Sequence, residues 1–128
     1  MLPLKKYNIL LVDDNQHFRE ALRYMLEESN PDGIETIFEA GSGKEALDLI
    51  RQHHIDMVFM DIEMPDMNGI EATRLATEQN RFIVIIALSF HKEMQYVMQM
   101  LEAGARNYII KEDINTQALK KIFENSLS

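Results

Sequence analysis

Several polar side chains of this 128-residue chain stand where predicted strands end. They are Asp13 and Asp14 after the apolar run at 7–12, Asp61 after the run at 55–60, Ser89 after the run at 82–88, and Lys111 after residues 107–110. If those strands lie parallel in one sheet, their carboxyl ends share an edge, which is where open α/β sheets bind ligands. The three acids, the hydroxyl and the amine are therefore expected to converge on one site.

The three carboxylates at this edge would repel one another. Two carboxylates about 5 Å apart repel by roughly 3 kcal/mol at an effective dielectric of 20, so three in one pocket are hard to keep ionised without a counter-ion. A few oxygen ligands with room for water and a phosphate suit Mg²⁺ better than a softer transition metal. The acids therefore predict a magnesium site. A single aspartate could instead cap a helix or form a turn, and Asp14 and Asn15 are both candidates for capping the first helix.

The segments that carry these residues alternate between strand-like and helix-like patterns. Buried apolar runs predict strands at 7–12, 34–40, 55–60, 82–88 and 107–110. Apolar residues at helical spacing predict five helices through Phe18, Ala21, Leu22, Met25 and Leu26; Ala46, Leu47, Leu49 and Ile50; Ile70, Ala72, Leu75 and Ala76; Met94, Val97, Met98 and Leu101; and Ala118, Leu119, Ile122 and Phe123. Ser42 and Glu45 form a capping box for the second helix, and Gly104 is expected to end the fourth.

Five strands alternating with five helices are too few for an eight-stranded barrel, which needs about 250 residues. The pattern instead predicts an α/β fold with an open, doubly wound, five-stranded parallel sheet of the flavodoxin-like type. Right-handed crossovers favour the strand order 2-1-3-4-5, which places the first and third strands side by side. We expect one domain over residues 1–128.

The composition of the chain argues against some kinds of binding partner and some cellular locations. The formal net charge of −8 argues against nucleic-acid binding by this segment, because such binding depends on clustered Lys and Arg. No apolar run is long enough to span a membrane, and no secretory signal leads into the first strand. We therefore expect no membrane contact and a cytoplasmic location. The absence of cysteine means that no disulfide holds the fold.

Short motifs throughout the chain resemble one family when they are taken together. They are Asp13-Asp14; Met60-Asp61-Ile62-Glu63-Met64-Pro65 with Asn68-Gly69; Ala87-Leu88-Ser89; and Ala103-Gly104-Ala105-Arg106-Asn107-Tyr108-Ile109-Ile110-Lys111. The chain resembles a response-regulator receiver domain of bacterial two-component signalling over essentially its whole length. It is most similar to the receivers that precede helix-turn-helix domains in transcription regulators.

The resemblance implies roles for the residues at the sheet edge. Asp61 would accept a phosphoryl group from a sensor histidine kinase, in a reaction that the domain itself catalyses without otherwise being an enzyme. Mg²⁺ would be held by Asp14, Asp61 and the backbone carbonyl of Glu63, with Asp13 assisting through water. Lys111 would pair with the phosphoryl group. Phosphoryl transfer needs an in-line nucleophile and neutralised equatorial oxygens, and these residue types supply both.

A switch is also implied by the resemblance. Ser89 would hydrogen-bond the phosphoryl group and draw its loop inward, and Tyr108 would swing from exposed toward buried as Ser89 moves. The face formed by the fourth helix, fifth strand and fifth helix would then control an output or a phosphorylation-dependent homodimer. On that helix, we expect Met94 and Met98 in the core and Tyr96 and Met100 among exposed contacts.

Three residues depart from the usual pattern of the family. Phe90 follows the hydroxyl residue, where a small side chain is more common, and it would restrict access to the site. Glu63 and His91 occupy variable positions that influence the lifetime of the phosphoryl group in the family. We expect an unusual lifetime, without a stated direction.

Two alternatives stay open at this point. A hydrolase of the haloacid dehalogenase type also uses an aspartate after a parallel strand, but that family wants a second aspartate two residues on, where Glu63 stands. A binding-only receiver would keep the fold without turning over phosphate, and Phe90 is the feature that favours it.

Overall fold

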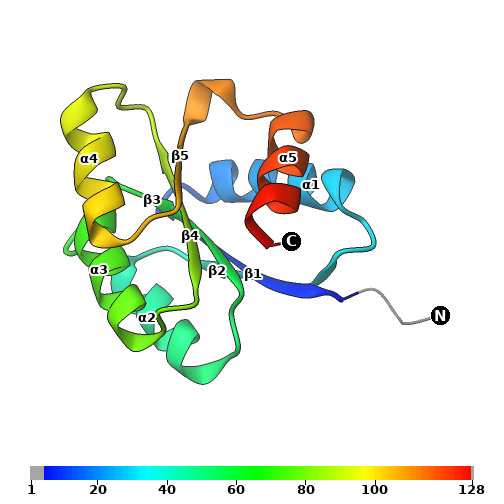
Figure 1. The fold of residues 1–128 in the computed structure, drawn as a ribbon, viewed down its shortest axis with the longest axis horizontal. Coiled ribbons are helices and arrows are strands. Elements are labelled where there is room, and N and C mark those ends of the chain that lie inside the picture. Colours follow the sequence, from blue (N-terminus) through cyan, green and yellow to red (C-terminus); the bar gives the residue numbers. More distant parts are fainter. Residues whose placement is uncertain (1–4, 128) are drawn as a thin grey trace.

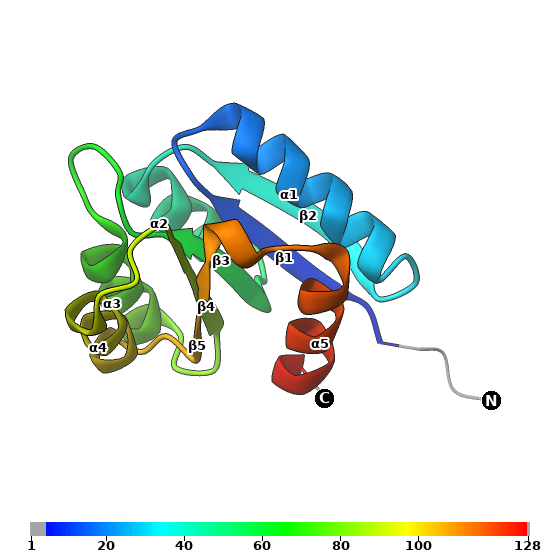
Figure 2. The same cartoon turned by 90° about the horizontal axis from the view of Figure 1, so that it is seen from above.

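The computed structural model describes residues 5–127, which form a parallel sheet covered by helices on both faces (Figures 1 and 2). In chain order the elements are β1 (Tyr7–Val12), α1 (Gln16–Ser29), β2 (Ile34–Ala40), α2 (Gly43–Gln52), β3 (Met57–Asp61), α3 (Gly69–Gln79), β4 (Val84–Ser89), α4 (Met94–Ala103), β5 (Asn107–Ile110), the 3-10 helix η1 (Lys111–Asp113) and α5 (Thr116–Leu127). Among these residues, none of the helices has the length and apolar character that a membrane crossing demands.

The sheet confirms the predicted topology. Its strand order is β2-β1-β3-β4-β5, and every neighbouring pair is parallel. Helices α1 and α5 pack together on one face, and α2, α3 and α4 cover the other (Figure 1). Alternate residues of the central strands therefore enter two separate apolar cores, such as Ile9 and Leu11 in one and Leu10 and Val12 in the other.

The helix ends follow the local signals in the sequence. The side chain of Asn15, rather than Asp14, caps α1 by accepting from the backbone N–H of Phe18. Ser42 caps α2 by accepting from Glu45 N–H, and the carboxylate of Glu45 reaches back to Gly41 N–H. Gly104 ends α4 with a φ of 120°, a conformation that favours glycine.

Two strands begin later than their apolar runs predict. β3 begins at Met57 rather than Ile55, because the chain bends at Asp56, whose carboxylate accepts the N–H of Asn8. β4 begins at Val84 rather than Phe82, which is 78% exposed. The side chain of Asn80 accepts the N–H of Phe82, so a turn occupies the start of that run.

The predicted burial of α4 is wrong. Met94 and Met98 are 68% and 47% exposed, whereas Met100 is fully buried in the core beneath α3 and α4. Tyr96 is half-buried against the same core. The apolar side chains of this helix surround it, so their spacing alone does not identify the face that contacts the sheet.

Candidate functional site

Asp13 is held in place from several directions at the end of β1. Its N–H donates to the carbonyl of Ala40 at the end of β2, and its Oδ1 accepts from Asn15 N–H at 2.9 Å. The residue is 1% exposed. Asp14, the next residue, is exposed.

The acids of β1 and β3 meet because these strands are neighbours in the sheet. Asp61 is the last residue of β3 and is 5% exposed. Carboxylate oxygens of Asp13, Asp14 and Asp61 all lie within 4.8 Å of one another. The strand order therefore produces the convergence of acids that the sequence predicts.

Lys111 joins the acids from the end of β5. Its Nζ lies 2.7 Å from Asp13 Oδ2 and 3.2 Å from Asp61 Oδ1, and its side chain is 6% exposed. The ring centroids of Phe18 and Phe90 lie 4.4 Å and 5.2 Å from the same nitrogen. The ammonium thus contacts two aromatic rings and pairs with two carboxylates.

The electrostatics of the site shift two pKa values. Burial, together with the nearby charges of Asp13 and Asp14, raises the pKa of Asp61 to about 6, although Lys111 opposes this effect. Burial alone would lower the pKa of Lys111, but its hydrogen bonds and charge interactions with Asp13 and Asp61 outweigh burial and raise it. Lys111 therefore stays charged, whereas Asp61 loses its proton only at a higher pH than an ordinary aspartate does.

A divalent cation fits this donor set. Three carboxylates and one ammonium give a formal charge of −2 when all are ionised. Octahedral Mg²⁺ holds oxygens at about 2.1 Å, so neighbouring ligand oxygens lie about 3.0 Å apart and opposite ones about 4.2 Å apart. The three carboxylate oxygens lie within 4.8 Å of one another, so rotation of these side chains would bring them to one ion. Asp13, Asp14 and Asp61 could hold the ion, which would supply positive charge for a bound phosphate.

Ser89 of β4 lines the same cleft, and Tyr108 lies on the neighbouring strand β5. Ser89 is 2% exposed, and its Oγ accepts from His91 N–H at 2.9 Å. The hydroxyl of half-buried Tyr108 donates to the carbonyl of His91 at 2.8 Å. The connection after β4 therefore contacts both predicted switch residues.

A contact between two loops forms part of the wall of the site. His91 Nε2 bonds the carboxylate of Glu63, and the His91 ring stacks on Tyr96 at a centroid distance of 4.2 Å. The Glu63 side chain thus points toward His91, and only its backbone carbonyl remains as the predicted metal ligand. The cleft beneath has a volume of about 730 Å³, and Asp61, Ser89 and Lys111 line it.

Phe90 is 62% exposed at the rim of this cleft. Its ring lies near the ammonium of Lys111 but leaves the cleft open to solvent. The restriction of access by this side chain stays a prediction.

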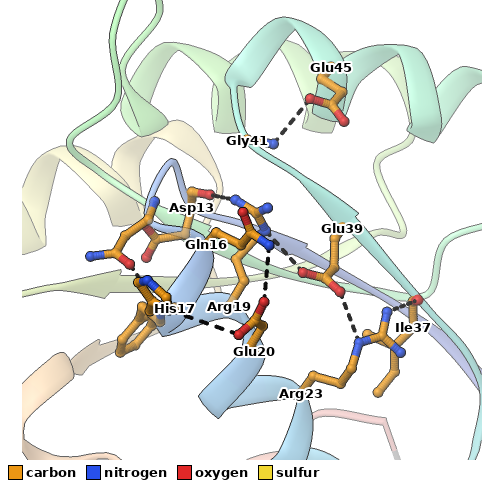
Figure 3. Close-up of polar contacts among 12 residues, drawn as sticks. Asp13, Gln16, His17, Arg19, Glu20, Arg23, Ile37, Glu39, Gly41 and Glu45 are labelled. Carbon is orange, nitrogen blue, oxygen red and sulfur yellow. Dashed lines mark hydrogen bonds and ion pairs between the residues drawn. The ribbon is translucent and has the colours of Figure 1, made fainter.

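Some residues at the site had no signal in the sequence pattern. Phe18 was expected only as a core position of the first helix, yet its ring faces the ammonium of Lys111. Arg19 donates to the carbonyl of Asp13 and pairs with Glu39 (Figure 3). Glu39 lies on β2, so only the fold reveals that it is close to Arg19.

Comparisons with known proteins agree on one family. The family model described as "Response regulator receiver domain" matches residues 9–124. The transcriptional regulatory protein DegU of Brevibacillus brevis is 35% identical over 107 residues, which cover 84% of this chain and 44% of DegU. The chain thus spans less than half the length of that relative.

Solved structures share the fold over nearly the whole chain. A two-component response regulator of the LuxR family from Aurantimonas sp. SI85-9A1 is 31% identical with a TM-score of 0.84, and the match covers 94% of this chain and 84% of that one. CheY in the CheX-CheY-BeF3-Mg complex from Borrelia burgdorferi is 27% identical with a TM-score of 0.83, covering 95% and 90%.

Proposed function

The chain belongs to the response regulator receiver domain family, and from this premise we propose that Asp61 accepts a phosphoryl group from a sensor histidine kinase. The observation that carries the proposal is the meeting of Asp13, Asp14 and Asp61 with the Lys111 ammonium at the carboxyl edge of the sheet. The chain would act as a phosphorylation-controlled switch that catalyses its own phosphorylation. The cytoplasmic location expected from the sequence remains part of this proposal.

The chemistry assigned to Asp61 is an in-line displacement. A carboxylate oxygen forms the new bond to phosphorus, while the bond from phosphorus to the donor's nitrogen or oxygen breaks and its electron pair leaves with the donor. Mg²⁺, when bound, neutralises charge on the phosphoryl oxygens. Lys111 would then exchange its contact with Asp61 for one with the phosphoryl group, and Ser89 would donate a hydrogen bond to it.

Mg²⁺ is the cofactor that we propose for the acidic cluster. Asp14, Asp61 and the backbone carbonyl of Glu63 would bind it directly, and Asp13 would assist mainly through water. The similar CheY structure from Borrelia burgdorferi is described as a complex with BeF3 and Mg, which supports the same pairing of ligands here.

The output proposed for the switch is a change in the face formed by α4, β5 and α5. Tyr108 already contacts the connection that Ser89 begins, so a shift of Ser89 toward a phosphoryl group would reach Tyr108 through His91. A homodimer that forms on phosphorylation and control of transcription, as the name of DegU suggests, are further parts of this proposal.

The two alternatives from the sequence receive less support. A hydrolase of the dehalogenase type needs an acid in the site two residues after Asp61, but the Glu63 side chain is 71% exposed and bonded to His91. A binding-only receiver was favoured by Phe90, yet the cleft beside Phe90 is open. Phosphoryl acceptance is therefore the better conclusion.

Beryllofluoride binding tests this proposal, because the ion imitates a phosphoryl group on an aspartate. We expect ¹⁹F NMR to detect a bound species with the wild-type chain and Mg²⁺, and to detect none with Asp61→Asn or without Mg²⁺. Asp32→Asn, at an exposed turn, is the matched control and should bind as wild type does. Binding that persists in Asp61→Asn would contradict the assignment of Asp61.

A further inference from the structure

Arg19 of α1 joins the backbone of the acidic cluster to the neighbouring strand. Its NH1 donates to the carbonyl of Asp13 at 2.5 Å, and its Nε donates to Glu39 Oε1 at 3.0 Å (Figure 3). The side chain is 16% exposed. One guanidinium thus holds two acceptors at once, as its planar fork of donors allows.

Glu39 is itself fixed by a second arginine. Its Oε2 accepts from Arg23 Nε at 2.9 Å, and Arg23 NH2 donates to the carbonyl of Ile37 at 2.8 Å (Figure 3). Burial would raise the pKa of Glu39, but its bonds and charge interactions with Arg19 and Arg23 outweigh burial and lower it. Glu39 therefore stays ionised and anchors Arg19 to β2.

The carbonyl that Arg19 contacts belongs to the peptide bond between Asp13 and Asp14. That bond is planar, so fixing its oxygen also fixes where the N and Cα atoms of Asp14 lie, and the Asp14 side chain starts from that Cα. The remaining polar atoms of Asp13 are already bonded, to Ala40, Asn15 and Lys111. Within residues 5–127, the carboxylate of exposed Asp14 has no hydrogen bond or ion pair, so its orientation depends on this backbone.

The group around Arg19 contributes little net charge to the site. Arg19 and Arg23 are balanced by Glu39 and by Glu27, whose Oε1 lies 3.7 Å from Arg23 NH1. A cation at the acids would therefore meet no uncompensated positive charge from this side. The contribution of Arg19 is orientation of the backbone.

We propose that Arg19 is a positioning residue for the divalent cation site, which holds the Asp13-Asp14 peptide in the orientation that aims Asp14 at the ion. Glu39 in turn positions Arg19. This inference rests on the proposed function, because it assumes that the three acids bind Mg²⁺. It adds two residues from α1 and β2 that the acidic motif itself does not contain.

Mg²⁺ affinity, measured by calorimetry on the folded protein, tests the inference. Loss of residues that orient metal ligands typically weakens binding by about 10- to 100-fold, and we expect Arg19→Gln to weaken Mg²⁺ binding by about tenfold. Arg74→Gln is the matched control, since Arg74 pairs with Glu71 and Glu78 on the exposed side of α3 and does not line the cleft. It should bind Mg²⁺ as wild type does.

Arg23→Gln tests whether Arg19 acts by positioning the Asp13-Asp14 peptide or only by supporting the fold. It breaks one of the two bonds to Glu39 but keeps the contact between Arg19 and Asp13, so Mg²⁺ affinity should change much less than in Arg19→Gln. Equal loss in both variants, or none in Arg19→Gln, would overturn the inference. Arg19→Lys should fall between wild type and Arg19→Gln, because an ammonium cannot reproduce both bonds in the same geometry.

Phosphorylation by acetyl phosphate supplies a second readout. In Arg19→Gln the Mg²⁺ concentration for half-maximal rate should rise, while the rate at saturating Mg²⁺ stays near that of wild type. A reduced rate at saturation with unchanged Mg²⁺ dependence would contradict a positioning role. If wild type bound no Mg²⁺ at all, the proposed metal site would fail, and that result differs from every outcome that concerns Arg19 alone.

Discussion

At the scale of single residues, the site pairs Asp61, whose pKa is raised, with Lys111, whose pKa is also raised so that its ammonium stays charged. The pKa of Asp61 is raised to about 6 by burial and by Asp13 and Asp14, against the opposing effect of Lys111. Aspartate attacks phosphorus only in its ionised carboxylate form, so a bound cation would favour the reactive form of Asp61 as well as neutralise the phosphate.

Asp61→Asn should stabilise the metal-free protein. The folded state holds the Asp61 proton more tightly than the unfolded state does, so ionisation costs stability as pH rises from about 4 to about 6, and the full cost persists above that range. We expect the variant to gain about 1–2 kcal/mol in urea unfolding at pH 7.5, and less at pH 5. A variant less stable than wild type at pH 7.5 without metal would contradict this reasoning.

Gly69→Ala should destabilise the protein through a single close approach. A Cβ at this position would lie 2.0 Å from the backbone oxygen of Asp61, and neither backbone segment can move without disturbing the site. We expect a loss of about 1–3 kcal/mol in urea unfolding. Gly41→Ala is the control, because its Cβ would meet its nearest neighbour at 3.6 Å and should change stability little. Similar losses in both variants would contradict this explanation.

At the scale of elements, three residues hydrogen-bond His91 in the connection from β4 to α4. Ser89 bonds the N–H of His91, Tyr108 of β5 bonds its carbonyl, and Glu63 of the connection after β3 bonds its ring. Movement of this connection therefore affects the entrance of the cleft and the β5 face together.

His91→Ala should shorten the lifetime of the phosphoryl group. The contact between His91 and Glu63 forms part of the wall of the cleft, so its removal should widen the cleft for both the phosphodonor and the water that hydrolyses the product. We expect severalfold increases in phosphorylation by acetyl phosphate and in dephosphorylation. Glu63→Ala should have a similar effect, and the double variant should add little, because both changes remove the same contact. Unchanged rates in both single variants would rule out this role for the contact.

The core of α4 offers a direct test of its corrected orientation. Met100 is fully buried and Met98 is 47% exposed. Met100→Ala should cost about 2–5 kcal/mol in unfolding free energy, whereas Met98→Ala should stay within about 0.5 kcal/mol of wild type. Greater destabilisation from Met98→Ala would restore the orientation that the apolar spacing suggested.

The strands could be predicted more completely than this helix. β1, β2 and β5 have the predicted bounds, and β1 carries a continuous buried apolar run from Ile9 to Val12. The late starts of β3 and β4 depend on the side-chain bonds of Asp56 and Asn80 to Asn8 and Phe82, which an apolar run does not encode. The face of α4 depends on its tertiary neighbours, since its apolar residues lie on more than one side.

At the scale of the whole molecule, the predicted strand order decides which distant residues meet. Asp13, Asp61, Ser89 and Lys111 line one cleft because four parallel strands end at the same edge. This convergence could be predicted from residue types after strands. The support from Arg19 and Glu39 could not, because it links a helix to a neighbouring strand through side-chain geometry alone.

Metal-dependent phosphorylation of Asp61 is the property on which the proposed switch depends. The most direct measurement is the intact mass of the protein after incubation with acetyl phosphate, with and without Mg²⁺, for wild type and Asp61→Asn. We predict one added phosphoryl group on wild type with Mg²⁺, and none without the metal or in the variant. An adduct that forms equally on Asp61→Asn would contradict the claim. So would the absence of any adduct on wild-type protein that also fails to bind beryllofluoride.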